Sequence, residues 1–121
     1  MSIGKIWPSE IIEFEDYDTR AKVRQLTQYR GHSHHFYFTN PGWYANGDKL
    51  LISSDRNNAT NLYGLEIKTG ELKQLTDLKP LPLPREVEFL RACVNPTKDE
   101  SYFLYGLDMI ALNLTTLESR V

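Results

Sequence analysis

Apolar and polar residues alternate with a period of two through most of this chain, in short segments separated by Gly, Asn, Asp and Pro. This alternation is typical of β-strands with one buried face, whereas an amphipathic helix shows a period of 3.6 residues. We therefore expect an all-β protein without helices. The clearest segment is 61–76, where two alternating runs flank Lys68-Thr-Gly70 and predict a β-hairpin.

The pattern of this hairpin occurs three times. Similar stretches lie at 17–27 and 111–121, which gives a spacing of about 50 residues, the length of a propeller blade or an array repeat. Asn95-Pro96 also repeats Asn40-Pro41 at the equivalent point of the unit. The repeat predicts the fold more strongly than it predicts the function.

The alternating runs predict one hairpin and two units of four antiparallel strands, the plan of a β-propeller blade. The hairpin has strands at 11–15 and 22–26, and its turn at 17–20 contains Asp and Thr, whose side chains favour turns. The strands of the two units are expected at 34–38, 49–53, 62–67 and 71–75, and then at 88–94, 102–105, 109–114 and 117–121.

We predict a single partial β-propeller over residues 1–121, with 32–76 as its first full blade and 87–121 as its second. The hairpin at 11–27 is half a blade, of the kind that completes the last blade of many propellers. Because propellers close with about four to eight blades, the chain is expected to be the front part of a longer protein. Alone, it would leave open blade edges through which copies could self-associate.

Residues 77–86 contain three prolines, and proline is excluded from central strands. We expect this segment to be the linker between the two blades. The alternative is a proline-rich ligand for an aromatic groove on a partner.

Composition agrees with a soluble globular domain, since 40% of residues are hydrophobic and 25% are charged. The formal net charge of -2 gives no broad cationic surface, so nucleic acid is not an expected partner. The beginning of the chain lacks the apolar core of a secretory signal, and no segment is long and apolar enough to span a bilayer. We expect a cytoplasmic protein without membrane contact. Cys93, in an apolar run, is expected to be a small buried side chain.

Several sequence elements resemble the blades of TolB-like propellers, and more specifically the amino-terminal part of oligogalacturonate lyases. In order along the chain they are Ala21-Lys-Val-Arg-Gln-Leu-Thr27, His32-Ser-His-His-Phe-Tyr-Phe38, Gly47-Asp-Lys-Leu-Leu51 and Leu72-Lys-Gln-Leu-Thr76. The resemblance covers nearly the whole chain but about the first third of such an enzyme. It implies about two and a half of an expected seven blades.

The resemblance also implies a cytoplasmic enzyme of pectin breakdown that cleaves short galacturonate oligomers by β-elimination with a divalent metal, typically manganese. A base removes the proton beside the uronate carboxylate, and a cation stabilises the charge that develops. The metal ligands and principal catalytic residues of the family lie in later blades, beyond Val121. We therefore expect no catalytic residue and no metal ligand in this segment, which should be inactive alone.

The three histidines, His32, His34 and His35, fall at the entry to the innermost strand of the first full blade. The period of two places His32 and His34 on one side of an extended chain and His35 on the other. Three roles are open: bonding to backbone or water, substrate contact in the central funnel, and metal binding, for which two neighbouring ligands are too few. The family has a histidine near this point, which makes His34 the first candidate for substrate contact, followed by His32.

Arginine suits uronate recognition because its planar guanidinium binds a carboxylate through two hydrogen bonds. The substrate-binding candidates are Arg30, beside the histidines, and Arg91, where an ion pair within the inner strand is the alternative. For Arg56, a third arginine that could bind a carboxylate, a solvated charge in a loop is the favoured interpretation. The aromatic residues at 36–38, 43 and 44 are expected to pack between blades rather than stack on sugars.

A second function is compatible with the same blades. A non-catalytic propeller of the TolB type would act as a scaffold that binds a protein partner and catalyses no reaction. Further blades carrying several histidines would favour the lyase, and their absence would favour the scaffold.

Overall fold

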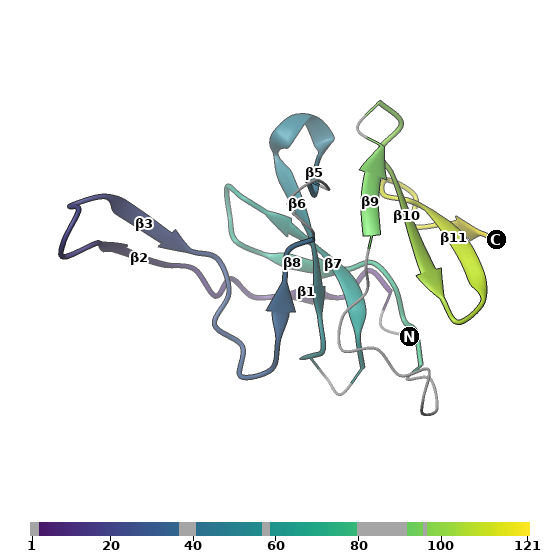
Figure 1. The fold of residues 1–121 in the computed structure, drawn as a ribbon, viewed down its shortest axis with the longest axis horizontal. Coiled ribbons are helices and arrows are strands. Elements are labelled where there is room, and N and C mark those ends of the chain that lie inside the picture. Colours follow the sequence, from purple (N-terminus) through teal and green to yellow (C-terminus); the bar gives the residue numbers. More distant parts are fainter. Residues whose placement is uncertain (1–2, 37–40, 57–58, 80–91, 96) are drawn as a thin grey trace.

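Antiparallel strands joined by turns make up the computed structural model, which describes residues 3–36, 41–56, 59–79, 92–95 and 97–121 (Figure 1). The described residues contain one 3-10 turn whose bounds are known, Ala45–Gly47, and no α-helix. The prediction of an all-β chain is therefore confirmed. The described residues include no helix of the length and hydropathy needed to cross a membrane.

The first sheet has six strands, in the order β1-β8-β7-β6-β4, with β5 also paired to β6. Neighbouring strands are antiparallel, and β6 and β7 pair over their full length from Lys49 opposite Glu66 to Ser54 opposite Asn61. The bounds are Ile6–Trp7 (β1), Ser33–His34 (β4), Trp43–Tyr44 (β5), Lys49–Ser54 (β6), Asn61–Glu66 (β7) and Leu72–Gln74 (β8).

This sheet departs from the predicted four-stranded unit in two places. His34, the first residue of the inner strand expected at 34–38, ends β4, which pairs with one end of β6, and residues 37 and 38 lie outside the described residues. The strand β5 was not predicted, and it pairs with the other end of β6. His35 is outside both strands, and its ring Nε2 accepts a hydrogen bond from the backbone N–H of Gly42 at 3.2 Å. The strand β1 was not predicted, and it adds to the outer edge of the sheet beside β8.

The second sheet has four strands, in the order β12-β11-β10-β9, as predicted. Their bounds are Ala92–Asn95 (β9), Glu100–Tyr105 (β10), Asp108–Asn113 (β11) and Ser119–Arg120 (β12). Asparagine side chains close two of its turns. Asn95 Oδ1 accepts from the N–H of Thr97 at 3.1 Å, and Asn113 Oδ1 accepts from those of Thr115 and Thr116 at 2.9 Å.

The predicted amino-terminal hairpin is present as a separate two-stranded sheet, β2 (Ile12–Glu15) with β3 (Lys22–Gln25), which projects away from the other strands in Figure 1. Its turn is held by Asp16, whose carboxylate accepts from the N–H and the hydroxyl of Thr19, both at 2.8 Å. These two hydrogen bonds hold the pKa of Asp16 below its usual value. Phe14 is 47% exposed, so the hairpin buries little of its own apolar surface. The structure does not test its role as a half blade, nor the division into blades and linker.

Two hydrophobic clusters cover the two faces of the first sheet. On one face, buried side chains of both sheets pack together, including Leu51, Leu62, Phe103 and Leu112. On the other face, Leu50, Ile52, Tyr63, Leu65 and Leu72 are covered by partly buried residues that include Trp7 and Leu26. The amino-terminal segment therefore shields the face of the first sheet that the second sheet leaves uncovered.

The expectation for Cys93 was wrong, because its side chain is exposed. Alternation along β9 turns the neighbouring Ala92, which is 4% exposed, toward the first sheet and turns Cys93 to the opposite face. The three prolines of 77–86 and the first four residues of the strand expected at 88–94 lie outside the described residues.

Candidate functional site

His32 and His34 lie on the same side of the chain at the end of β4, as the period of two predicts. Their rings are nearly parallel, at 13°, with centroids 5.9 Å apart. His32 is exposed and His34 is partly buried. His35 points elsewhere, toward Gly42 and Phe36.

Asp55, directly after β6, holds His32 through two hydrogen bonds. Its Oδ1 accepts from the backbone N–H of His32 at 2.6 Å, and its Oδ2 lies 2.7 Å from the ring Nδ1. The register that places Ser33 opposite Ser54 brings these two residues together. A carboxylate at this position favours the tautomer with the proton on Nδ1, in which Nε2 is the accepting nitrogen.

The pKa of the Asp55 carboxyl reflects the same contacts. Burial alone would raise it, but the side-chain and backbone hydrogen bonds from His32, together with the charge of the imidazole, hold it below its usual value. The folded state therefore binds a proton at Asp55 less readily than the unfolded chain does.

A pH titration should show this difference. We expect the carboxyl carbon of Asp55 to titrate in NMR with a midpoint below about 3.9, the value of an unperturbed aspartate. The stabilisation by the His32 contact is present above the unfolded pKa and is lost as the pH falls through the lower, folded pKa. A midpoint at or above the unperturbed value would show that the contact does not form.

Arg56 is completely buried, so the expectation of a solvated loop charge was wrong. Its Nη1 donates to Glu10 Oε2 at 2.9 Å, and its guanidinium carbon lies 4.7 Å from the ring centre of Tyr29, 5.3 Å from Tyr63 and 5.4 Å from Trp7. Burial raises the pKa of Tyr63 to about 12, against the opposing charge of Arg56. The cation is stable in this position because it has both a carboxylate and aromatic faces around it.

Three consecutive residues, Ser54, Asp55 and Arg56, hold the loop that carries the candidate residues. Ser54 Oγ accepts from Arg56 Nε at 3.0 Å. Arg56 orients Glu10, whose Oε1 accepts from the N–H of Gln28 at 3.0 Å. Asp55 holds the other end of the loop at His32, so the segment 28–32 is fixed at both ends and presents the exposed Arg30 between them.

The structure brings three of the four substrate-binding candidates, His32, His34 and Arg30, into one short region. The fourth, Arg91, lies outside the described residues. Among the residues described, no group of three or more His, Cys, Asp or Glu side chains is placed to hold a metal ion. These residues alone do not fit the metal that the family resemblance implies.

Asp55 and Glu10 were missed by sequence reasoning. Asp55 is 23 residues from His32, and Glu10 is 46 residues from Arg56. The register of β4 on β6 identifies the first contact once the strands are paired. No local sequence pattern indicates the contact between Glu10 and Arg56.

Comparison with known proteins identifies the fold to which this region belongs. No family model matches the sequence, and no curated protein matches it. Among solved structures, an oligogalacturonate lyase from Vibrio parahaemolyticus matches 98% of the chain with a TM-score of 0.82 and 26% identity. An oligogalacturonate lyase in complex with manganese matches 100% of the chain with a TM-score of 0.83 and 26% identity. Over almost its whole length the chain is similar in fold to part of these oligogalacturonate lyases.

The chain spans about three tenths of the length of these oligogalacturonate lyases, 30% of the first and 31% of the second. Its two larger sheets and its hairpin therefore correspond to part of a propeller-type lyase. The resemblance inferred from sequence motifs is confirmed by the structural match.

Proposed function

We propose that this chain is part of an enzyme that cleaves short galacturonate oligomers by β-elimination, and that His34, His32 and Arg30 contact the substrate. The observation that carries the proposal is the structural match to two oligogalacturonate lyases over at least 98% of the chain at 26% identity. The manganese of one of these lyases supports a divalent metal in the complete enzyme. Its ligands are proposed to lie beyond residue 121.

The chemistry of the three side chains supports a binding role. Every uronate unit carries a carboxylate, which the exposed guanidinium of Arg30 can bind through two hydrogen bonds. The imidazoles of His32 and His34 can exchange hydrogen bonds with sugar hydroxyls. Since the loop between Gln28 and His32 is held at both ends, these groups are oriented before substrate arrives, which lowers the entropic cost of binding.

Neither the general base nor the metal site is assigned to the described residues. The 121-residue chain by itself is therefore expected to show no lyase activity. The protein encoded by the complete reading frame, which includes these residues, is the form in which the activity should be measured.

Replacing His34 with alanine tests the proposal in that complete protein. Loss of a hydrogen bond to a charged substrate should raise KM for digalacturonate by about tenfold, with a smaller change in kcat. The matched control is Lys22→Ala, because Lys22 is exposed on the projecting hairpin, and it should leave both constants unchanged. A His34→Ala saturation curve and turnover identical to those of the unmodified protein would remove His34 from the site.

A further inference from the structure

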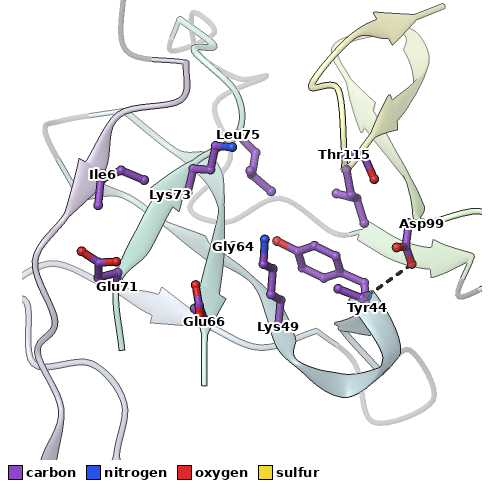
Figure 2. A pocket seen from close by; sticks show the side chains of 12 residues that line it. Ile6, Tyr44, Lys49, Gly64, Glu66, Glu71, Lys73, Leu75, Asp99 and Thr115 are labelled. Carbon is purple, nitrogen blue, oxygen red and sulfur yellow. Dashed lines mark hydrogen bonds between the residues drawn. The ribbon is translucent and has the colours of Figure 1, made fainter. Parts of the chain in front are cut away.

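A cavity of about 160 Å³ lies between the first sheet and the turns of the second sheet (Figure 2). Its walls come from β1 and from the segment from β5 to β8 on one side, and from Asp99, Leu114 and Thr115 on the other. It lies at the Lys49 end of β6, whereas His34 pairs with Ser53 near the opposite end. Four residues of extended strand correspond to about 13 Å, so the cavity is separate from the histidine region.

The cavity depends on the absence of a side chain at Gly64. This residue lies in the middle of β7, opposite Leu51 on one side and Lys73 on the other. A Cβ at position 64 would collide with the hydroxyl oxygen of Tyr44. The ring of Tyr44 therefore extends across the backbone of β7 and brings its hydroxyl into the cavity (Figure 2).

The hydroxyl of Tyr44 faces the cavity. The side chain is 5% exposed, and within the described part of the chain no hydrogen bond to its hydroxyl is present. Burial raises the pKa of Tyr44 well above its usual value, and the carboxylate of Asp99 adds to this effect. The group therefore stays protonated, and its hydroxyl can donate a hydrogen bond to a molecule in the cavity.

Charged side chains of both signs surround this hydroxyl without pairing with one another. Lys49 and Glu66 are directly opposite in the register of β6 and β7, Glu71 directly precedes β8 and Lys73 lies on it. Among the residues described, none of these four makes an ion pair within 4.0 Å. Their ammonium donors and carboxylate acceptors remain available around one small space.

We propose that this cavity binds a neutral, hydroxyl-rich molecule of about the size of one sugar ring. Hydroxyl groups both donate and accept, so one such molecule satisfies the tyrosine, the lysines and the glutamates together. The lining carries a formal charge of -1, since it contains two lysines and three acidic residues, Glu66, Glu71 and Asp99. This charge disfavours binding of an anion. The apolar side chains of Ile6, Leu75 and Leu114 offer contact to the C–H face of a ring.

Saturation-transfer NMR with D-galactose and myo-inositol tests the site on the protein of the complete reading frame. We expect saturable transfer to at least one of the two polyols. Tyr44→Phe should weaken its binding by about two- to tenfold, the contribution of one hydrogen bond. The matched control is Tyr17→Phe, since Tyr17 is 88% exposed on the hairpin turn, and it should leave binding unchanged.

Gly64→Ala supplies a second variant, which blocks the cavity through the displaced Tyr44 side chain and should abolish the transfer. Tyr44→Phe keeps the packing and decides the outcome if Gly64→Ala fails to fold. No saturable transfer with either polyol would overturn the proposal. Polyol binding that is unchanged in Tyr44→Phe would also overturn it. Loss of polyol binding in His34→Ala would overturn it as well, because that result would place the polyol at the histidine region. Absence of lyase activity would count against the proposed function but not against polyol binding in this cavity.

Discussion

Replacing Arg56 with methionine is expected to lower the free energy of unfolding by about 3–5 kcal/mol, the usual effect of removing one partner of a buried ion pair. Arg56 is fully buried, and the side chain of its partner Glu10 is 16% exposed. The change leaves that carboxylate without its cation and removes the guanidinium from three aromatic rings. Urea denaturation followed by tryptophan fluorescence measures the loss.

The matched control is Arg20→Met. Arg20 also pairs with a glutamate, Glu15, but the two side chains are 76% and 55% exposed, so the loss should stay below about 1 kcal/mol. Adding Glu10→Gln to Arg56→Met should restore part of the stability, because the unpaired carboxylate is then neutral. Equal losses for Arg56→Met and Arg20→Met would contradict the buried pair.

Replacing Phe103 with alanine should destabilise the protein by about 3–5 kcal/mol, since it removes a large core side chain and leaves a cavity. Phe103 is 2% exposed and belongs to the cluster that joins the two larger sheets. The loss should appear as a lower urea midpoint. It tests the packing of the second sheet on the first more directly than any surface change.

The next residue along the same strand provides the control. Leu104 points to the opposite face of β10 and is 60% exposed. In the 121-residue chain, Leu104→Ala should cost less than about 1 kcal/mol. Similar losses for the two variants would mean that the sheets do not pack through the face that carries Phe103.

The strands that sequence analysis predicted well are those with long alternation and clear turns. The pattern at 62–67 corresponds to β7 at Asn61–Glu66, and Gly70 follows with a φ of 79° that a residue with a side chain rarely adopts. The short strands β1 and β5 have two residues each. Two residues cannot display a period, so only the pairing with β8 and β6 reveals them.

Burial of single side chains was harder to predict because it depends on contacts between distant segments. Cys93 lies in an apolar run, but which face of the second sheet is covered depends on how that sheet packs against the first. Arg56 follows a strand in a polar loop, which is the usual setting of a solvated charge. Its burial depends on Glu10 and Trp7, which the pairing of β1 with β8 brings near.

The candidate site shows the same limits. The period of two correctly placed His32 and His34 on one side, because that relation is local. The hydrogen bonds between Asp55 and His32 depend on the register of β4 on β6, which alternation alone does not specify. The polar cavity beside Gly64 requires both sheets, and no local pattern signals it.

The most direct test of the lyase proposal is the cleavage of digalacturonate by the protein of the complete reading frame, measured with added Mn²⁺ and again after chelation. Formation of the unsaturated uronate can be followed by its ultraviolet absorbance. The proposal predicts product formation that requires the metal and that the 121-residue chain alone does not catalyse. No metal-dependent turnover by the folded, complete protein would contradict it.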